Sequence, residues 1–134
     1  MCFHIQVDAK PWTKRIVYKV LEGKSRNKVK FESPFQQKEY RLGRTERVEE
    51  NAVFSGQFTR SGRANAGLYV YGTLKEAIAD AKRNGPFEWN DTTVVVACKV
   101  SPRDFLYTDG STQATYRAIT PMKIVFRVKA TTES

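Results

Sequence analysis

The residues with the clearest chemical potential lie in the first stretch of the chain, MCFHIQV. If Met1 is removed, Cys2 combines an α-amino group and a thiol, a pairing of base and nucleophile within one residue. His4 is the single histidine and shares a face with Cys2 in an extended segment, so its imidazole can lower the thiol pKa or act as a general base. The alternative is structural: Cys2 starts a strand as a small hydrophobic residue, and His4 is a packing or surface residue.

Three further side chains suit a ligand that carries both a flat ring and a negative charge. Lys19 shares a face of its predicted strand with Val17 and Leu21, so its amine either reaches solvent or contacts a bound anion. Tyr69 and Tyr71 alternate with apolar residues and therefore share one face, where two aromatic rings can hold a nucleobase. Ordinary packing within a sheet is the alternative for both tyrosines.

Common catalytic motifs are absent from the sequence: it contains no GxGxxG, Walker, GxSxG or HExxH pattern. Cys2 and Cys98 lack metal-ligand spacing, and one histidine cannot complete a usual zinc site with them. We therefore expect no structural metal and no cofactor. Cys98 lies within the apolar run TTVVVACKV, where we expect it to serve packing.

The composition predicts one globular domain over residues 1–134 with a strongly basic first half. The net charge is +9, and residues 1–65 carry 14 Lys and Arg against 7 Asp and Glu. Such a field attracts polyanions, namely nucleic acids, nucleotides or acidic protein surfaces. We expect no membrane segment, because no apolar run approaches the roughly 20 residues that a spanning helix needs. Two cysteines without a secretory leader suggest free thiols in the cytosol.

The pattern of apolar residues predicts an α+β fold with a mostly antiparallel sheet. Strands are expected at 15–21, 28–31 (an edge strand, because of its lysines), 67–71, 92–100 (central), 105–107, 115–119 and 122–128, with Pro121 as a break. Asp109-Gly110 predicts a hairpin. Residues 73–84 form the clearest helix, because Thr73 and Glu76 have capping-box spacing and Asn84-Gly85-Pro86 ends the pattern. The arginine-rich stretch 33–66 reads as a long irregular connection.

Several short motifs together resemble a group of small phage-encoded proteins. These are the Met-Cys start, YKV, SPFQ, GLYVYGTLKEA and VVVACKV, which span about residues 1–125. Their order is also similar to that of ADP-ribosyltransferase-like domains. That resemblance implies that Lys19 stands in the first strand's catalytic position, Tyr69 in the second, and Gln113 where the family has a glutamate. A glutamine supplies no carboxylate, so classical ADP-ribosyl transfer is not what the resemblance predicts.

The resemblance to phage counter-defence proteins extends to the anti-CBASS depurinases, which cleave the N-glycosidic bond of a cyclic nucleotide signal. This implies a nucleotide or cyclic dinucleotide ligand in the cytoplasm of an infected bacterial host. Such cleavage needs groups for the base, the phosphates and the sugar. The expected assignments are Tyr69 or Tyr71 for the base, Lys19 and Arg63 for phosphate, and Asp104 or Asp109 as the carboxylate.

Two other functions fit the same composition. One is a non-catalytic inhibitor that binds a host defence protein or a nucleic acid through the arginine-rich segment 41–63. The other is sequence-nonspecific binding of RNA or DNA, for which the chain offers charge but no recognisable helix-turn-helix or zinc finger. Neither the ligand nor the oligomeric state follows from the sequence.

Overall fold

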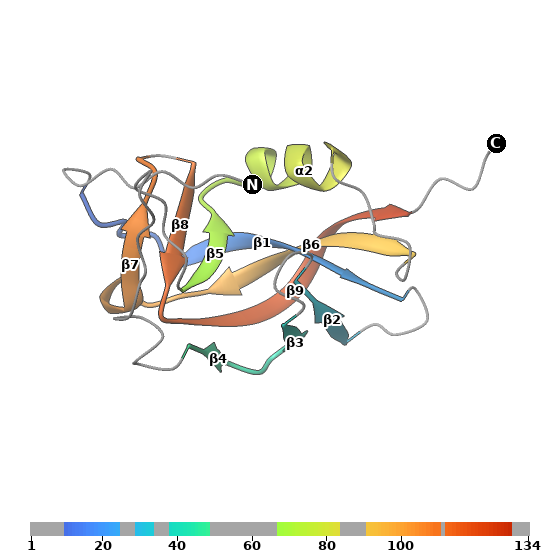
Figure 1. Cartoon of the computed structure of the whole chain (residues 1–134), viewed down its shortest axis with the longest axis horizontal. Helices are drawn as coiled ribbons and strands as arrows, with labels where there is room; N and C mark the ends of the chain where they lie inside the picture. The colour runs from blue at the N-terminus through green and yellow to red at the C-terminus, as the bar shows by residue number, and fades with distance from the viewer. Residues whose placement is uncertain are drawn as a thin grey trace, which may run out of the picture.

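The computed structural model describes residues 10–24, 29–33, 38–48, 67–83, 91–110 and 112–129. Within them a long sheet runs in the order β4-β9-β6-β1-β5-β8-β7 (Figure 1). These strands are β1 (Ile16–Gly23), β4 (Glu46–Arg47), β5 (Leu68–Tyr71), β6 (Thr92–Lys99), β7 (Phe105–Thr108), β8 (Gln113–Tyr116) and β9 (Ala118–Lys129). Every pairing is antiparallel. The predicted α+β class, with a mostly antiparallel sheet and one helix, is confirmed.

The two faces of the sheet are covered differently, and β1 shows why. Val17, Lys19 and Leu21 point to one face and are buried there, whereas Tyr18 and Val20 point to the other. Helix α2 (Leu74–Arg83) covers the Tyr18 side. On the opposite side lie the short strands β2 (Lys30–Glu32), β3 (Glu39–Arg41) and β4 (Figure 1). Lys19 is thus a charged residue within an apolar row.

Helix α2 begins and ends close to the predicted positions. The Thr73 hydroxyl accepts from the Glu76 backbone N–H at 3.3 Å, as the N-cap residue of a capping box does, and it donates to Oε1 of Glu76 at 2.8 Å. Ala77 and Ala81 pack on Val20, Tyr71 and Val95. The helix ends at Arg83, where Lys82 and Arg83 complement its dipole. At ten residues α2 is far too short to cross a membrane, and the described residues contain no other α-helix.

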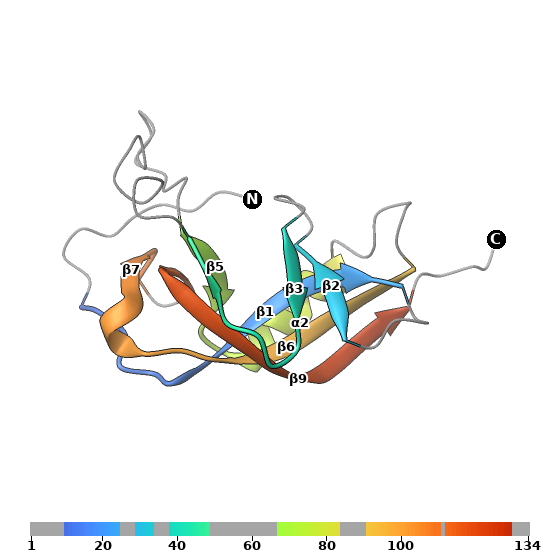
Figure 2. The same cartoon turned by 90° about the horizontal axis from the view of Figure 1, so that it is seen from below.

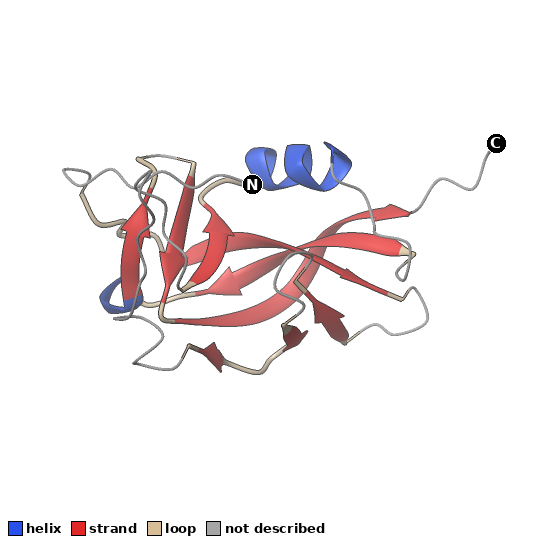
Figure 3. Cartoon of the chain, in the orientation of Figure 1, coloured by secondary structure: helices blue, strands red, loops and turns tan. Residues whose placement is uncertain are grey.

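Strand β6 is central, as predicted, with β1 on one side and β9 on the other (Figure 3). The prediction that Pro121 breaks the following strand is wrong. Strand β9 continues through Pro121, because β9 carries an extra residue, Met122, opposite the step from Ala97 to Cys98, and a bulge at this place tolerates the missing N–H. The chain turns instead at Arg117, between β8 and β9, so the predicted strand 115–119 is two different strands.

Strands β2 and β3, with the residues beside them, form an arm over the Lys19 face; we name it the β2–β3 arm (residues 29–33 and 38–42). The predicted edge position of β2 is wrong, since β2 pairs with β1 at Glu22–Glu32 and with β3 along its other side. The lysines of this segment were expected to discourage pairing with a further strand. Lys30 instead forms an ion pair with Glu39 of β3 at 3.5 Å, so its charge does not prevent β3 from pairing there. Figure 2 shows the arm standing out from the long sheet.

The hairpin predicted at Asp109-Gly110 joins β7 to β8. Gly110 has a φ of 123°, a conformation that favours glycine. Oδ1 of Asp109 accepts hydrogen bonds from the backbone N–H groups of Thr112 and Gln113 at 3.0 and 2.9 Å. The aspartate therefore holds the loop closed.

Candidate active site

The most unusual group in the described structure is the amine of Lys19. The residue is 5% exposed and belongs to the Val17–Leu21 row of the core. Its Nζ donates a hydrogen bond to the backbone carbonyl of Tyr69 at 2.6 Å. Among the described residues no carboxylate lies within ion-pair distance of this amine. A buried ammonium group without a counter-ion is costly, and such groups concentrate at functional sites.

Burial has a strong effect on the protonation of this group. It lowers the pKa of Lys19 from 10.5 to about 8, because the charged form loses its hydration; the nearby Cys98 acts in the opposite direction. The same burial raises the pKa of the Cys98 thiol to about 12. Cys98 therefore stays a neutral thiol, and its Sγ lies 3.6 Å from the Val96 carbonyl to which it donates. This supports the predicted packing role of Cys98.

Tyr40 of the β2–β3 arm lies over the buried amine. The Lys19 Nζ is 5.3 Å from the centre of the Tyr40 ring, a distance at which an ammonium group is attracted to an aromatic face. Tyr40 is fully buried, and its hydroxyl has no hydrogen-bond partner among the described residues. Burial raises the Tyr40 pKa, with the charges of Cys98 and Glu46 acting in the same direction. Packing, not hydrogen bonding, therefore holds this side chain over Lys19.

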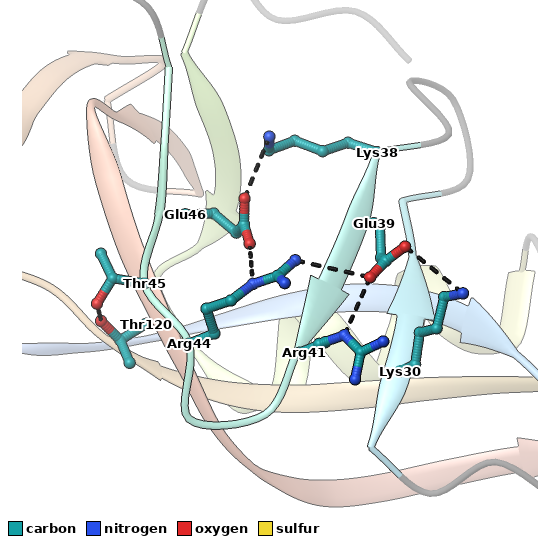
Figure 4. A network of polar contacts seen from close by, with 8 residues as sticks. All are labelled: Lys30, Lys38, Glu39, Arg41, Arg44, Thr45, Glu46 and Thr120. Atoms are coloured by element: carbon teal, nitrogen blue, oxygen red, sulfur yellow. Dashed lines mark hydrogen bonds and ion pairs between the residues drawn. The ribbon is translucent and has the colours of Figure 1, made fainter.

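Charged side chains of and beside the β2–β3 arm form a network of ion pairs (Figure 4). Lys38 lies 6.0 Å from the centre of the Tyr40 ring and 3.3 Å from Glu46. Arg44 contacts Glu46 at 2.8 Å and Glu39 at 3.6 Å. The side chain of Glu46 is only 14% exposed, against 41% for Glu39. The Tyr40 ring that covers the buried amine is thus linked through Lys38 to a carboxylate, Glu46, and a second cation, Arg44.

The arm carrying Tyr40 is attached to the rest of the molecule at few points. Strand β3 pairs only with β2 among the described strands, and β2 meets β1 at one registered pair. Beyond Arg41, the Gly43 N–H donates to the Pro121 carbonyl at 2.6 Å, and the hydroxyls of Thr45 and Thr120 are 2.6 Å apart (Figure 4). A segment with so few ladder bonds opens more easily than the central strands.

The tyrosines singled out in the sequence lie on the other face of the sheet from the Lys19 amine. Leu68 and Val70 belong to the Lys19 side of the core, so the rings of Tyr69 and Tyr71 project toward the α2 side. Lys19 therefore meets the backbone of Tyr69, not its ring. The Tyr71 hydroxyl is hydrogen bonded to Asp80 of α2, and only 9% of the residue is exposed. Tyr69 is half-buried.

The polar candidates of the β7–β8 region separate into two places. Gln113 is the cross-strand neighbour of Tyr71, and its N–H is bonded to Asp109. Asp104 lies at the other end of the hairpin, in the 3-10 turn η1 (Pro102–Asp104), where its carbonyl accepts from the Arg117 N–H at 2.7 Å. Of the two aspartates, Asp109 is thus the one beside Gln113 and Tyr71.

Cys2, His4 and Arg63 lie outside the described residues. Tyr40, which lies over the Lys19 amine, and the charged residues Lys38, Arg44 and Glu46 on its arm and beside it were not among the candidates taken from the sequence. The alternation of charged and aromatic residues in KEYR is a strand signal, yet it is only four residues long. Nothing in the local pattern connects it to Lys19, because that contact depends on the arm folding back over β1.

Comparison with known proteins adds no relative: no family model, curated protein or solved structure matches the chain. No group of acidic, histidine or cysteine side chains among the described residues is arranged to hold a metal ion. The chemistry considered below therefore uses the side chains around Lys19 alone.

Proposed function

We propose that the protein binds a nucleotide at the Lys19–Tyr40 site. The observation that carries this proposal is the buried amine of Lys19, which faces an aromatic ring and has no carboxylate partner among the described residues. An anionic ligand would supply the missing negative charge, and an aromatic ring would bind its base. The Tyr40 hydroxyl, which has no partner in the part of the chain that the structure describes, offers a further hydrogen bond.

The neighbouring side chains suit the parts of such a ligand. Lys38 and Arg44 lie at the rim, where they would contact phosphate groups. Displacement of Tyr40 from its present position would let its ring stack on the base while Lys19 lines the floor of the site. Glu46 is the carboxylate beside this group.

We propose further that the ligand is a cyclic nucleotide signal and that the reaction is cleavage of its N-glycosidic bond. In this view the protein is a phage counter-defence factor with an ADP-ribosyltransferase-like arrangement, acting in the cytoplasm of an infected bacterium. The resemblance of YKV, GLYVYGTLKEA and VVVACKV supports this role. The cleavage passes through an oxocarbenium-like centre, which a carboxylate stabilises. Glu46 is better placed for that task than Asp104 or Asp109, because it lies beside the ring of Tyr40.

Incubation with a panel of cyclic mono- and dinucleotides, linear nucleotides and NAD, followed by chromatography, tests both parts. We expect a free base from at least one cyclic nucleotide and a thermal shift with that ligand. Lys19→Met should abolish both effects, whereas Lys123→Met, which removes an exposed lysine of β9, should preserve them. Unchanged ligands together with unchanged melting temperatures would refute the proposal.

A second function is favoured by the surface charge. Arg41, Arg44 and Arg47 are all exposed along β3 and β4, which suits a non-catalytic inhibitor that docks on a host protein or nucleic acid. This function predicts a complex with host material that weakens as salt increases. Substitution of the three arginines by glutamine should abolish this complex. Nucleotide turnover by the Lys19 site should be unaltered only in a variant that retains Arg44 and substitutes the other two arginines.

A further inference from the structure

We propose that the amine of Lys19 acts as a nucleophile and forms an imine with C1′ of the ribosyl group during cleavage. This inference rests on the proposed function and deepens it, because it assigns the step that breaks the N-glycosidic bond. It also makes a prediction about the amine itself, namely selective reaction with small phosphorylated aldehydes.

The surroundings of the amine carry the inference. Lys19 is the only buried lysine among the described residues. Its Nζ has one hydrogen-bond acceptor, the Tyr69 carbonyl at 2.6 Å, which fixes the direction of the side chain. Its other near neighbours are the Tyr40 ring and the Cys98 thiol, neither of which is a strong acceptor. Lysines are activated as nucleophiles by desolvation of this kind.

The protonation state agrees with this geometry. With a pKa of about 8, about a tenth of the amine is unprotonated at pH 7, whereas an exposed lysine has well under a thousandth in that form. A carboxylate in contact would favour the ammonium form and cancel this gain. The lack of such a partner among the described residues is therefore what a nucleophilic amine requires.

The chemical steps balance without any oxidant or metal. The lone pair of the amine attacks C1′, the bond from C1′ to the base breaks, and its electron pair stays on the base nitrogen. That nitrogen gains the proton that the amine loses. The ring bond from C1′ to O4′ then opens, and the second amine proton passes to O4′, which leaves a neutral imine. Water adds to C1′, releasing the sugar as an aldehyde and restoring the amine.

The first test uses the full-length protein, a cyclic nucleotide that it cleaves, and sodium cyanoborohydride, which reduces an imine to a stable amine. We expect the intact mass to increase by that of the reduced sugar phosphate, with the adduct mapped to Lys19 and absent in Lys19→Arg. Release of free base without any trapped adduct would overturn the inference and leave the proposed function standing.

The second test does not depend on nucleotide turnover. Pyridoxal 5′-phosphate with cyanoborohydride labels accessible, unprotonated amines, and peptide mapping reports the rate at each lysine. We expect Lys19 to be labelled at least tenfold faster than Lys123 at pH 7, with the ratio falling as the pH rises to 10. Labelling confined to exposed lysines overturns the inference, whether or not any nucleotide is cleaved. Circular dichroism of Lys19→Arg checks that this variant is folded.

Discussion

The amine of Lys19 reaches the backbone carbonyl of Tyr69 at 2.6 Å, across two strands that share one registered pair, Tyr18 with Tyr71. Strand β1 follows β6 over eight pairs, whereas β5 follows β8. The side chain of Lys19 therefore spans a place where the backbone ladder between β1 and β5 is short. This contact also explains why a lysine occupies an otherwise apolar row.

The first prediction concerns the balance between this hydrogen bond and the burial of charge. Lys19→Met keeps the length of the side chain, removes the desolvated ammonium group, and takes a donor away from the Tyr69 carbonyl. Desolvation costs about 3 kcal/mol on the basis of the lowered pKa of Lys19, and the loss of a hydrogen bond from a charged donor costs about 1.5–3 kcal/mol. We expect the variant to be at least as stable as the parent at pH 7 in urea denaturation. A loss above about 2 kcal/mol would show that the hydrogen bond outweighs the desolvation.

A second prediction follows from the direction of the Lys19 pKa shift. The folded state holds the Lys19 proton less tightly than the unfolded state, with a pKa of about 8 against 10.5, so stability should increase as the pH rises above about 8. Cys98 acts oppositely: its folded pKa of about 12 exceeds the ordinary 9.0, so stability should decrease above about pH 9. Thermal melts should therefore show stability rising from about pH 8 to 9 and then levelling off up to about pH 10, because the two effects offset each other there.

The variants separate the two contributions to this profile. In Lys19→Met the increase between pH 8 and 9 should be absent and stability should fall above about pH 9, whereas in Cys98→Ala the increase should continue above pH 9. A wild-type melting temperature that falls steadily from pH 7 to 10 would contradict the assignment of a lowered pKa to Lys19.

The sequence predicted the elements well where the signal is local and long. Helix α2 was recognisable from the Thr73–Glu76 cap, and β6 from its unbroken apolar run, because both signals lie within the element itself. Pro121 misled the prediction because its tolerance depends on the bulge at Met122, which forms where β9 pairs with β6. A bulge is a property of the pairing between two strands, so the sequence of one strand does not reveal it.

The candidate site was harder to predict for a related reason. Lys19 was identified as unusual from the alternation within β1, but its neighbours come from the β2–β3 arm, which packs through a few long-range contacts. Tyr40 could be expected to be buried, yet not to lie over Lys19. The sequence placed Lys19 and the tyrosines of β5 in one site. Alternation shows that Tyr69 and Tyr71 share a face of β5, but which face of the sheet that is depends on how β5 is placed beside β1.

A third prediction tests how the arm is seated on the sheet. A Cβ on Gly23 would lie 2.7 Å from Cδ1 of Phe31, which is 2% exposed and fills the core beneath the arm. Gly23→Ala should therefore displace Phe31 and destabilise the protein by about 1–3 kcal/mol in urea denaturation. In a Phe31→Leu background the same substitution should cost less, since the crowded ring is gone. An equal cost in both backgrounds would mean that backbone conformation, and not Phe31, sets the requirement for glycine.

A fourth prediction distinguishes a structural from a ligand-binding role for Tyr71. Its hydroxyl is hydrogen bonded to the buried carboxylate of Asp80, so Tyr71→Phe should lower the free energy of unfolding by about 1–2 kcal/mol. Tyr18→Phe is the matched control, because Tyr18 is the cross-strand neighbour and its hydroxyl has no hydrogen bond among the described residues. Nucleotide binding should be unchanged in both variants. If Tyr71→Phe, but not Tyr18→Phe, weakens the thermal shift caused by nucleotide, Tyr71 takes part in nucleotide binding.

The last prediction compares the two glutamates of the charged network, which share Arg44 as a partner but differ in position. Glu46 is the more buried and affects the Tyr40 hydroxyl, whereas Glu39 lies among exposed cations that screen it. If Glu46 stabilises the charge that develops on the sugar, Glu46→Gln should reduce kcat for base release at least a hundredfold with little change in KM. Glu39→Gln should leave kcat within about threefold, because exposed ion pairs contribute little. Equal losses in the two variants would indicate that the network only holds the β2–β3 arm in place, and that the carboxylate acting on the sugar lies elsewhere.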